Sequence, residues 1–382
     1  MIDRPDLKPM DDYQNSSAPI LNRQTWQATI VRLLIGSLAS ATTLWLLWQL
    51  VATTSETEDG PQISTYLEQV VWSLLVIYFV AQILQILLRA LRYRILLRPN
   101  RTLSEPRIIP AFNLPGLKHI FLVALCRNMM VDLFPARLGE LSYVLMLNRG
   151  YRVPASLCFS SLVASFVFDL MALGLLLLLI LLASIGLASL FPESLTLVFF
   201  AALALIVLAT AVVVTAIQFF HPLARWLDRR PAVYLQRLAG FLRQFDQAIH
   251  DIRRQGIYTY MLSLSLLIRV VKYGGLYLLF IAVTKNSFPD LNTVPWTQIL
   301  MAFIGAEAAA SLPVPSLMSF GVYEAGGLLT LSLQGFDPSK VLLAIFLVHL
   351  LSQIVDYVLG GLGLFVFSMV AGKRASRQDF ES

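Results

Sequence analysis

Apolar residues along this chain gather in long, uninterrupted runs and do not alternate at every second position. The longest runs occupy residues 30–52, 70–88, 160–187, 195–219, 257–284 and 341–369. Each is long enough to cross about 30 Å of hydrocarbon as a helix that rises 1.5 Å per residue. The pattern predicts an all-α, polytopic membrane protein with six full spans.

The composition supports this class. Of the 382 residues, 57% are hydrophobic and 14% are charged, and the mean hydropathy is +0.71. These values exclude disorder, a disulfide-stapled secreted scaffold and a soluble enzyme with one packed core. Cys126 and Cys158 lie in apolar runs and the four histidines are scattered, so we expect neither a metal site nor a bound cofactor.

The basic residues predict the orientation. Residues 89–118 carry seven Lys or Arg against one acid, and this bias places that segment in the cytoplasm. The polar segment 1–29 and the tail 373–382 are then cytoplasmic as well, on either side of a membrane domain at 30–372. The net charge of +6 fits attraction to anionic lipid better than to nucleic acid.

A broken apolar segment at 119–148 lies between two basic stretches, so it must enter the membrane and return on the same side. Its arms, 119–134 and 138–148, have 16 and 11 residues, which is short of the roughly 17 to 25 that a span needs. The break contains Pro135, Arg137, Gly139 and Glu140. Proline and glycine interrupt helices, so the segment predicts a re-entrant helical hairpin.

A second broken segment follows the same pattern. Its arms, 296–312 and 320–333, are separated by Pro313, Pro315 and Gly321, and Glu324 follows. The order of spans places its entry on the opposite side of the membrane. The sequence span, hairpin, span thus occurs twice, at 70–187 and 257–369, and predicts an inverted-topology repeat of the kind that builds alternating-access sites.

Charged residues occur inside these apolar segments, where each costs roughly 2.5 to 3.5 kcal/mol on the insertion scale. They are Arg127, Asp132, Arg137, Glu140, Asp169, Arg269, Lys272, Glu307, Glu324 and Asp356. Arg269 and Lys272 share one helix face and repel each other, so they need an anionic headgroup or carboxylates such as Glu324 and Asp356. An architectural reading, in which the charges only lock the hairpins together, stays open.

Two further features are open to more than one interpretation. His349 precedes Asp356 by seven residues and is expected either to make a plain hydrogen bond or to relay protons. In the segment 221–255, apolar residues repeat at steps of three and four, which predicts an amphipathic cytoplasmic helix at the interface. It is either an elbow between the two halves or a lipid sensor.

Three motifs resemble the transmembrane (flippase) domain of lysylphosphatidylglycerol synthases and its stand-alone relatives. They are the stretch Leu133-Phe134-Pro135-Ala136-Arg137-Leu138-Gly139-Glu140-Leu141, Asp169, and Leu312-Pro313 through Gly321-Val322-Tyr323-Glu324-Ala325. The resemblance covers about residues 74–367. The chain departs from the family's pattern at 164–168, at 315–319, and in the last span, where His349 or Gln353 replaces a common arginine. Bifunctional members carry a soluble aminoacyl-transferase domain after this part, for which the chain to residue 382 leaves no room.

The resemblance implies a stand-alone flippase of the cell (inner) membrane that moves an anionic phospholipid or a lipid-linked substrate between leaflets. The predicted substrate-binding residues are Arg127, Arg137, Glu140, Arg269, Lys272 and Glu324. The predicted coupling or structural carboxylates are Asp132, Asp169, Glu307 and Asp356. The sequence contains no ATP-binding loop of the Gly-x-x-x-x-Gly-Lys type, so a gradient would supply the energy.

Two other function classes remain at this point. One is a membrane-embedded glycosyl- or phosphoryl-transferase, although the only acids in an aqueous loop, such as Asp228 and Asp246, are diluted by arginines. The other is an accessory subunit of a partner synthase or glycosyltransferase. A homo-oligomer is compatible with all three.

Overall fold

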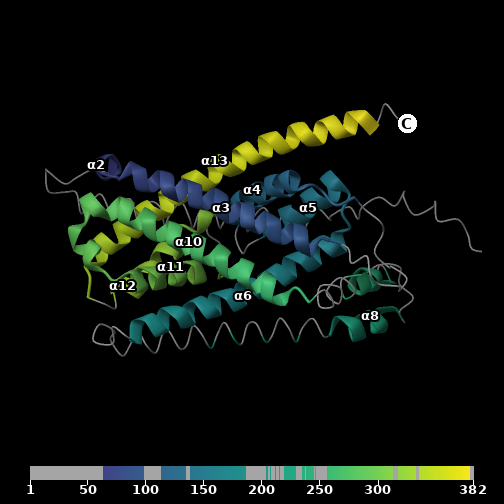
Figure 1. The fold of residues 1–382 in the computed structure, drawn as a ribbon, viewed down its shortest axis with the longest axis horizontal. Coiled ribbons are helices and arrows are strands. Elements are labelled where there is room, and N and C mark those ends of the chain that lie inside the picture. Colours follow the sequence, from purple (N-terminus) through teal and green to yellow (C-terminus); the bar gives the residue numbers. More distant parts are fainter. Residues whose placement is uncertain are drawn as a thin grey trace, which may run out of the picture.

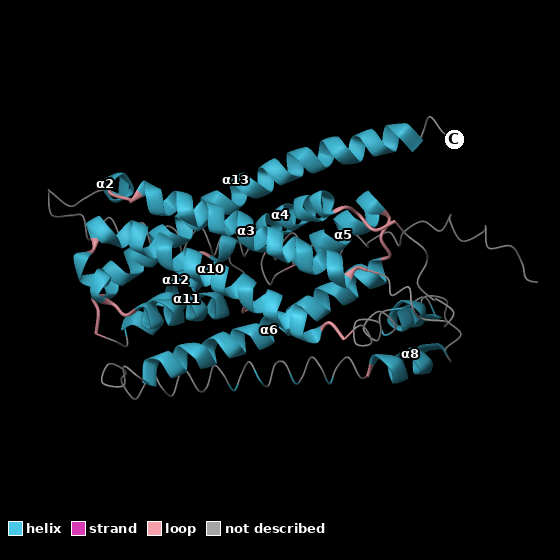
Figure 2. Cartoon of the chain, viewed as in Figure 1, coloured by secondary structure: helices cyan, strands magenta, loops and turns pink. Residues whose placement is uncertain are grey.

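The structure is a computed structural model in which every described element is a helix (Figure 2). The described residues are 63–98, 113–134, 138–185, 256–312, 317–332 and 335–378, together with 204, 207, 211, 215, 219–228, 235–236, 238–244 and 246. The expected first span at 30–52 and most of the expected span at 195–219 lie outside them. Within these ranges there is no strand, which confirms the all-α prediction.

Four long helices run side by side along the length of the molecule (Figure 1). They are α3 (Trp72–Leu96), α6 (Ala155–Ile185), α10 (Tyr258–Ser287) and α13 (Pro338–Gln378), and the short α2 (Ile63–Glu68) precedes the first. Each contains a stretch long and apolar enough to cross a membrane, with mean hydropathy between 1.9 and 2.5. The chain is therefore a multi-pass membrane protein.

Two pairs of shorter helices are inserted between the long ones. The first hairpin, α4 (Leu117–Leu133) and α5 (Glu140–Tyr151), lies between α3 and α6. The second hairpin, α11 (Trp296–Ala310) and α12 (Val322–Ser332), lies between α10 and α13. At 1.5 Å per residue the longest of these, α4 with 17 residues, measures about 26 Å and falls short of the hydrocarbon thickness.

The two hairpins lie toward opposite ends of the long helices (Figure 1). The 3-10 turn η4 (Pro289–Thr293) leads into the second hairpin, and η5 (Leu317–Ser319) lies at its break. Helix α4 of the first hairpin contacts η5 of the second. The order of one long helix, two short helices and another long helix therefore occurs twice. The boundaries of the four short helices lie within three residues of those expected from sequence, whereas α3 and α13 end eight and nine residues later than expected.

Glycines allow the arms of each hairpin to approach closely. A Cβ atom on Gly139 would lie 1.9 Å from the carbonyl oxygen of Met130, so a larger residue would collide with the backbone of α4. In the second hairpin a Cβ atom on Gly326 would lie 2.7 Å from the carbonyl oxygen of Gly305. Side chains cannot give way to relieve a clash with backbone, so both hairpins depend on these positions.

The tip of the second hairpin, residues 317–321, has an unusual backbone. Met318 and Ser319 adopt left-handed conformations with φ of 55° and 60°, and Gly321 has φ of 86°. The first two conformations cost a residue with a Cβ atom roughly 1 to 2 kcal/mol each. Contacts between the tip and other parts of the fold must therefore hold this backbone in place.

The long helices pack around the hairpins through small residues and aromatic rings. Gly275 of α10 lies against Tyr78 and Ala81 of α3. On α13, Gly360 faces Met129 and Gly363 faces Leu125, both on α4. Glycines at these two positions let α13 approach α4 closely.

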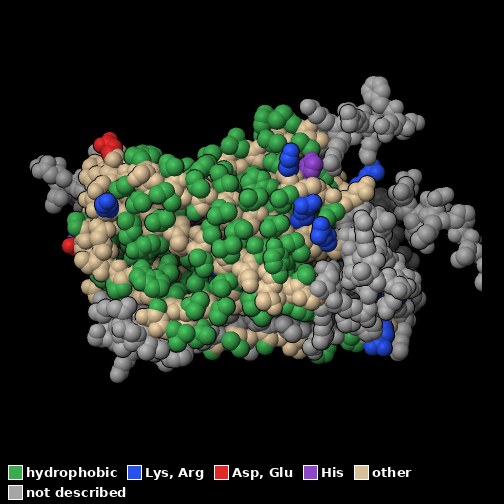
Figure 3. All heavy atoms as spheres, viewed as in Figure 1, with side chains coloured by type: hydrophobic (Ala, Val, Ile, Leu, Met, Phe, Trp, Pro, Cys, Tyr) green, Lys and Arg blue, Asp and Glu red, His purple; other side chains and the backbone are tan. Residues whose placement is uncertain are grey.

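The outer surface is apolar along most of its length. In Figure 3 hydrophobic side chains cover the visible face between its ends, and Lys and Arg gather at the end that carries α5 and α8. Helix α8 (Phe220–Asp228) belongs to the predicted amphipathic segment. Its Ala224 and Leu227 form a small apolar cluster with Ala239 and Leu242, and most of the remaining segment lies outside the described residues.

Candidate functional site

Each of the two repeated units places a pair of basic residues on its first long helix. Arg89 and Arg92 lie on α3, and Arg269 and Lys272 lie on α10. Residues three apart share one face of a helix, so each pair projects in a similar direction. The sequence interpretation that began a cytoplasmic loop at Arg89 was wrong, because α3 continues to Leu96 and carries both arginines.

The two terminal nitrogens of Arg92 are held by polar partners on two neighbouring helices. Its side chain is buried, and its Nη1 and Nη2 atoms donate to Oδ1 and Oδ2 of Asp169 at 2.6 and 2.9 Å. Nη1 also donates to Oγ of Ser265 at 2.7 Å. This bidentate pair joins α3, α6 and α10, and gives Asp169 a direct structural role.

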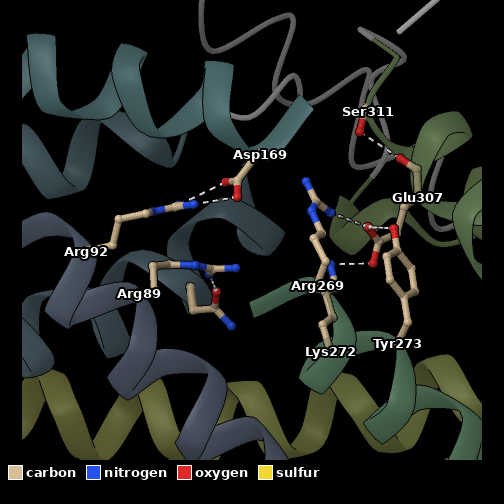
Figure 4. A network of polar contacts seen from close by, with 9 residues as sticks. Arg89, Arg92, Asp169, Arg269, Lys272, Tyr273, Glu307 and Ser311 are labelled. Carbon is tan, nitrogen blue, oxygen red and sulfur yellow. Dashed lines mark hydrogen bonds and ion pairs between the residues drawn. The ribbon is translucent and has the colours of Figure 1, made fainter. Parts of the chain in front are cut away.

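Glu307 of α11 is shared by the two cations of α10. It forms an ion pair with Lys272, lies 3.6 Å from Nη1 of Arg269, and accepts a hydrogen bond from the hydroxyl of Tyr273 at 3.1 Å (Figure 4). Glu324 and Asp356, which were expected to neutralise this pair, have other partners. The reason is that α11 packs against α10 and brings Glu307 to the face of α10 that carries Arg269 and Lys272.

Of the four bases on α3 and α10 named above, Arg89 is the one without an ion-pair partner among the described residues. Its Nη1 donates to Oδ1 of Asn128 at 2.5 Å, and none of the described carboxylates forms an ion pair with it. Asn128 donates in turn to Oδ1 of Asp356 at 2.9 Å, and Gln82 donates to the same oxygen at 2.5 Å. Arg89 therefore reaches Asp356 only through an amide.

Arg127 and Glu140 close the first hairpin from within. Nε of Arg127 donates to Oε2 of Glu140 at 2.7 Å, and a second contact joins Nη2 to Oε1. Both side chains remain partly exposed. Arg137, the other candidate partner of Glu140, lies outside the described residues. Asp132 lies one turn after Asn128 on α4, and forms no ion pair with any described residue.

Glu324 and His349 form a buried pair between the second hairpin and α13. Oε1 of Glu324 lies 2.6 Å from Nδ1 of His349, and Oε2 accepts a hydrogen bond from the backbone N–H of Gly321 at 2.5 Å. Glu324 is 0% exposed and His349 is 2% exposed. The expected hydrogen bond of His349 is confirmed, although its partner is Glu324 and not Asp356.

The charged residues thus separate into a closed group and an accessible group. Arg92, Glu324 and His349 are buried and fully surrounded. The side chains of Arg269 and Lys272 are 14% and 28% exposed, although they lie well inside α10. Figure 4 shows Arg89 on α3 and Arg92 beside it on one side of the view, and Arg269 and Lys272 of α10 on the other, with Asp169 joined to Arg92 and Glu307 joined to the bases of α10.

Sequence reasoning missed Arg89, Arg92, Gln82, Asn128 and Tyr273. The arginines were assigned to a loop because a hydropathy run ends at the first charge. A usable signal was present, since the three-residue spacing of Arg89 and Arg92 is repeated by Arg269 and Lys272 in the corresponding helix. The amides and the tyrosine have no such signal, because neutral polar residues are ordinary in apolar helices.

The arrangement was compared with known proteins. No curated protein and no solved structure matches the chain. The family model described as the lysylphosphatidylglycerol synthase TM region matches residues 30–360, which covers both repeated units and most of the chain. The match links the protein to membrane lipid metabolism or transport. The chain belongs to the lysylphosphatidylglycerol synthase TM region family.

Proposed function

We propose that this protein moves an anionic phospholipid, or a lipid-linked anion, between the two leaflets of the cell inner membrane. The observation that carries the proposal is the set of bases that α3 and α10 place within apolar helices (Figure 4): Arg89, whose direct partner is the amide of Asn128, and the pair Arg269 and Lys272, which share Glu307. Like charges repel, so a bound phosphate would stabilise these bases.

The local charge balance supports an anionic ligand. Glu307 carries one negative charge against two positive charges from Arg269 and Lys272. Arg89 has only the amide of Asn128 as a direct partner among the described residues. In direct ion pairs among the described residues, the four bases Arg89, Arg92, Arg269 and Lys272 share two carboxylates, Asp169 and Glu307, in an apolar surrounding where isolated charges are costly.

The roles within the site follow from exposure and partners. Arg89, Arg269 and Lys272 would bind the headgroup, and Arg127 of the first hairpin would extend this basic surface. Glu307 and Glu140 would orient these cations, and Asp169 would anchor Arg92. Arg137 keeps its predicted role as a headgroup ligand. The carboxylates Asp132 and Asp356 would help to neutralise the bases or carry the coupling protons.

The membrane placement is part of the proposal. We infer six full spans with two re-entrant hairpins that enter from opposite faces, and an N-terminus in the cytoplasm. The short arms of both hairpins and their places toward opposite ends support it. In single-cysteine variants Ala136→Cys and Ser316→Cys, membrane-impermeant thiol reagents should label the two positions from opposite sides. Labelling from one side only would reject the inverted arrangement.

Transport is tested by reconstituting the protein in vesicles with a fluorescent phosphatidylglycerol and quenching the outer leaflet. Arg89→Gln and Arg269→Gln should each slow exchange by about tenfold or more, because a hydrogen bond to a charged group is worth about 1.5 to 3 kcal/mol. Arg149→Gln, an exposed position in the last turn of α5, is the matched control and should exchange lipid at the wild-type rate. Equal rates in all four proteins would reject the role of the bases.

A further inference from the structure

We propose that the buried Glu324–His349 pair binds one proton, and that this proton latches the tip of the second hairpin to α13. The inference deepens the proposed function, because it names the proton as the coupling ion. It also removes Glu324 from the substrate-binding residues. The pair lies at the junction of three elements: the tip, α12 and α13.

The carboxylate of Glu324 is fully engaged in holding the tip. Its Oε2 atom accepts the backbone N–H of Gly321, and its Oε1 atom meets Nδ1 of His349. No part of this side chain is exposed. A substrate therefore has no access to it in this conformation, whereas a proton needs no such space.

The imidazole of His349 is covered by aromatic rings from the second hairpin. The ring of Tyr323 stacks on it with centroids 4.2 Å apart and planes within 25°, and the ring of Phe320 lies 4.5 Å away. The faces of aromatic rings attract cations by about 0.5 to 2 kcal/mol, with the larger value for desolvated groups. These contacts link the charge of the imidazole to the position of the tip.

Gln353 provides a partner for either protonation state of His349. Its Nε2 atom lies 3.1 Å from Nε2 of His349, and its Oε1 atom is buried without a partner among the described residues. In this arrangement neutral His349 donates from Nδ1 to Glu324 and accepts at Nε2 from Gln353. After a proton from water binds to the lone pair of Nε2, a half-turn of the amide lets Oε1 accept that new N–H.

Proton binding changes the charge of the pair from −1 to zero. A net charge buried in an apolar surrounding is costly, whereas a neutral ion pair with complete hydrogen bonds is tolerated. The left-handed residues Met318 and Ser319 store backbone strain at the tip. Loss of the proton would weaken the contacts that offset this strain, so the tip should loosen as the pH rises.

Other titratable groups surround the pair and contribute to its field. Tyr323 contacts the imidazole directly and is within electrostatic range of the acid on α11 and tyrosines on α3 and α10. Helix α4, which contacts η5, carries an acid in its last turn, and α13 carries another two turns after His349. The acid on α11 is Glu307, and the tyrosines on α3 and α10 are Tyr78 and Tyr273. The acids on α4 and α13 are Asp132 and Asp356.

Proton binding is tested directly by solid-state NMR of the full chain, labelled with ¹⁵N-histidine, in zwitterionic bilayers without anionic lipid. The chain has four histidines, and His349→Gln assigns the relevant signal. Between about pH 5 and about pH 9, the Nε2 resonance should convert from an imidazolium shift to a neutral, non-protonated shift. A single state at every pH would overturn the proposal.

The latch is tested by the rate at which a thiol at the tip is labelled. Ser319→Cys is placed in a background where both natural cysteines are replaced by alanine, and its labelling rate at each pH is divided by that of a free model thiol, because the thiolate is the reacting form. This normalised rate should be several-fold higher at high pH than at low pH. The pH response should vanish in His349→Gln and persist in the control His119→Gln, which alters a histidine at the start of α4. The same pH response in all proteins would overturn the latch.

A milder variant separates these outcomes from misfolding. Gln353→Leu removes the amide that pairs with both the neutral and the protonated form of His349. The imidazolium then loses its hydrogen-bond acceptor at Nε2, so the transition in labelling rate should move to lower pH. An unmoved transition would contradict the role of Gln353. Neither measurement involves an anionic lipid, so both can succeed while the transport proposal fails, and the reverse also holds.

Discussion

The two hairpins have similar architecture, but the glutamate of each is paired with a different kind of partner. Each has a glutamate at or near the start of its second helix, Glu140 in α5 and Glu324 in α12. Glu140 pairs with Arg127 of its own hairpin and stays partly exposed. Glu324 pairs with His349 of α13 and is buried.

This difference assigns different roles to similar elements. The first hairpin closes on itself through a two-contact pair of Arg127 and Glu140, so both partners belong to the same hairpin. The second hairpin is joined to a long helix through a histidine, which is the residue proposed above to bind the proton. The comparison indicates that the first hairpin provides a fixed basic surface and the second provides the movable element.

The largest expected contrast is in stability. Glu324→Ala leaves His349 and the N–H of Gly321 without their buried acceptor, and should lower the free energy of unfolding by about 3 to 5 kcal/mol. Glu140→Ala removes a partly exposed pair and should cost about 1 to 2 kcal/mol. Reversible unfolding in mixed micelles, followed by circular dichroism, measures both. Equal losses would remove the distinction between the hairpins.

Alanine substitutions of glycines compare the close contacts between the arms of the two hairpins. Gly139→Ala places a methyl group against backbone and should cost about 3 kcal/mol, whereas Gly326→Ala meets a slightly more distant oxygen and should cost about 1 to 2 kcal/mol. Gly274 of α10 faces open space, so Gly274→Ala should be neutral or stabilise by up to about 1 kcal/mol. The midpoints of thermal unfolding rank the three variants, and a reversed order would contradict the arm contacts.

Exchanging the two residues of each charge pair should give the smallest and most specific effect on the free energy of unfolding. In the first hairpin, Arg127→Glu with Glu140→Arg should recover most of the roughly 1 to 2 kcal/mol lost by either single variant. In the second, Glu324→His with His349→Glu should recover little, because the tip's N–H and aromatic rings require their present partners. A double-mutant cycle on unfolding free energies checks this, and equal recovery in both hairpins would argue against a dedicated latch.

Much of the helical framework could be predicted from the sequence. Long apolar runs locate the spans, since only helices with about 20 such residues satisfy their backbone within hydrocarbon. Proline and glycine at 134–140 and 313–321 marked the breaks between the short helices. These signals are local, so they survive without knowledge of the tertiary packing.

The pairing of charges could not be predicted in the same way. Glu324 was expected near Arg269 but meets His349, and Glu307 takes the place beside Arg269. Which carboxylate meets which base depends on how α11 and α12 rotate against α10 and α13, and one helix residue turns by about 100°. Arg92 was missed for a simpler reason, because the end of an apolar run was taken as the end of its helix.

The central claim is that the interior bases select an anionic lipid headgroup for movement between leaflets. The most direct measurement compares initial exchange rates of fluorescent phosphatidylglycerol and phosphatidylcholine in the same vesicles containing the wild-type protein. The account predicts a ratio of about ten or more in favour of the anionic lipid, and a ratio near one when Arg89 and Arg269 are both changed to glutamine. Equal exchange of the two lipids by the wild-type protein would contradict it.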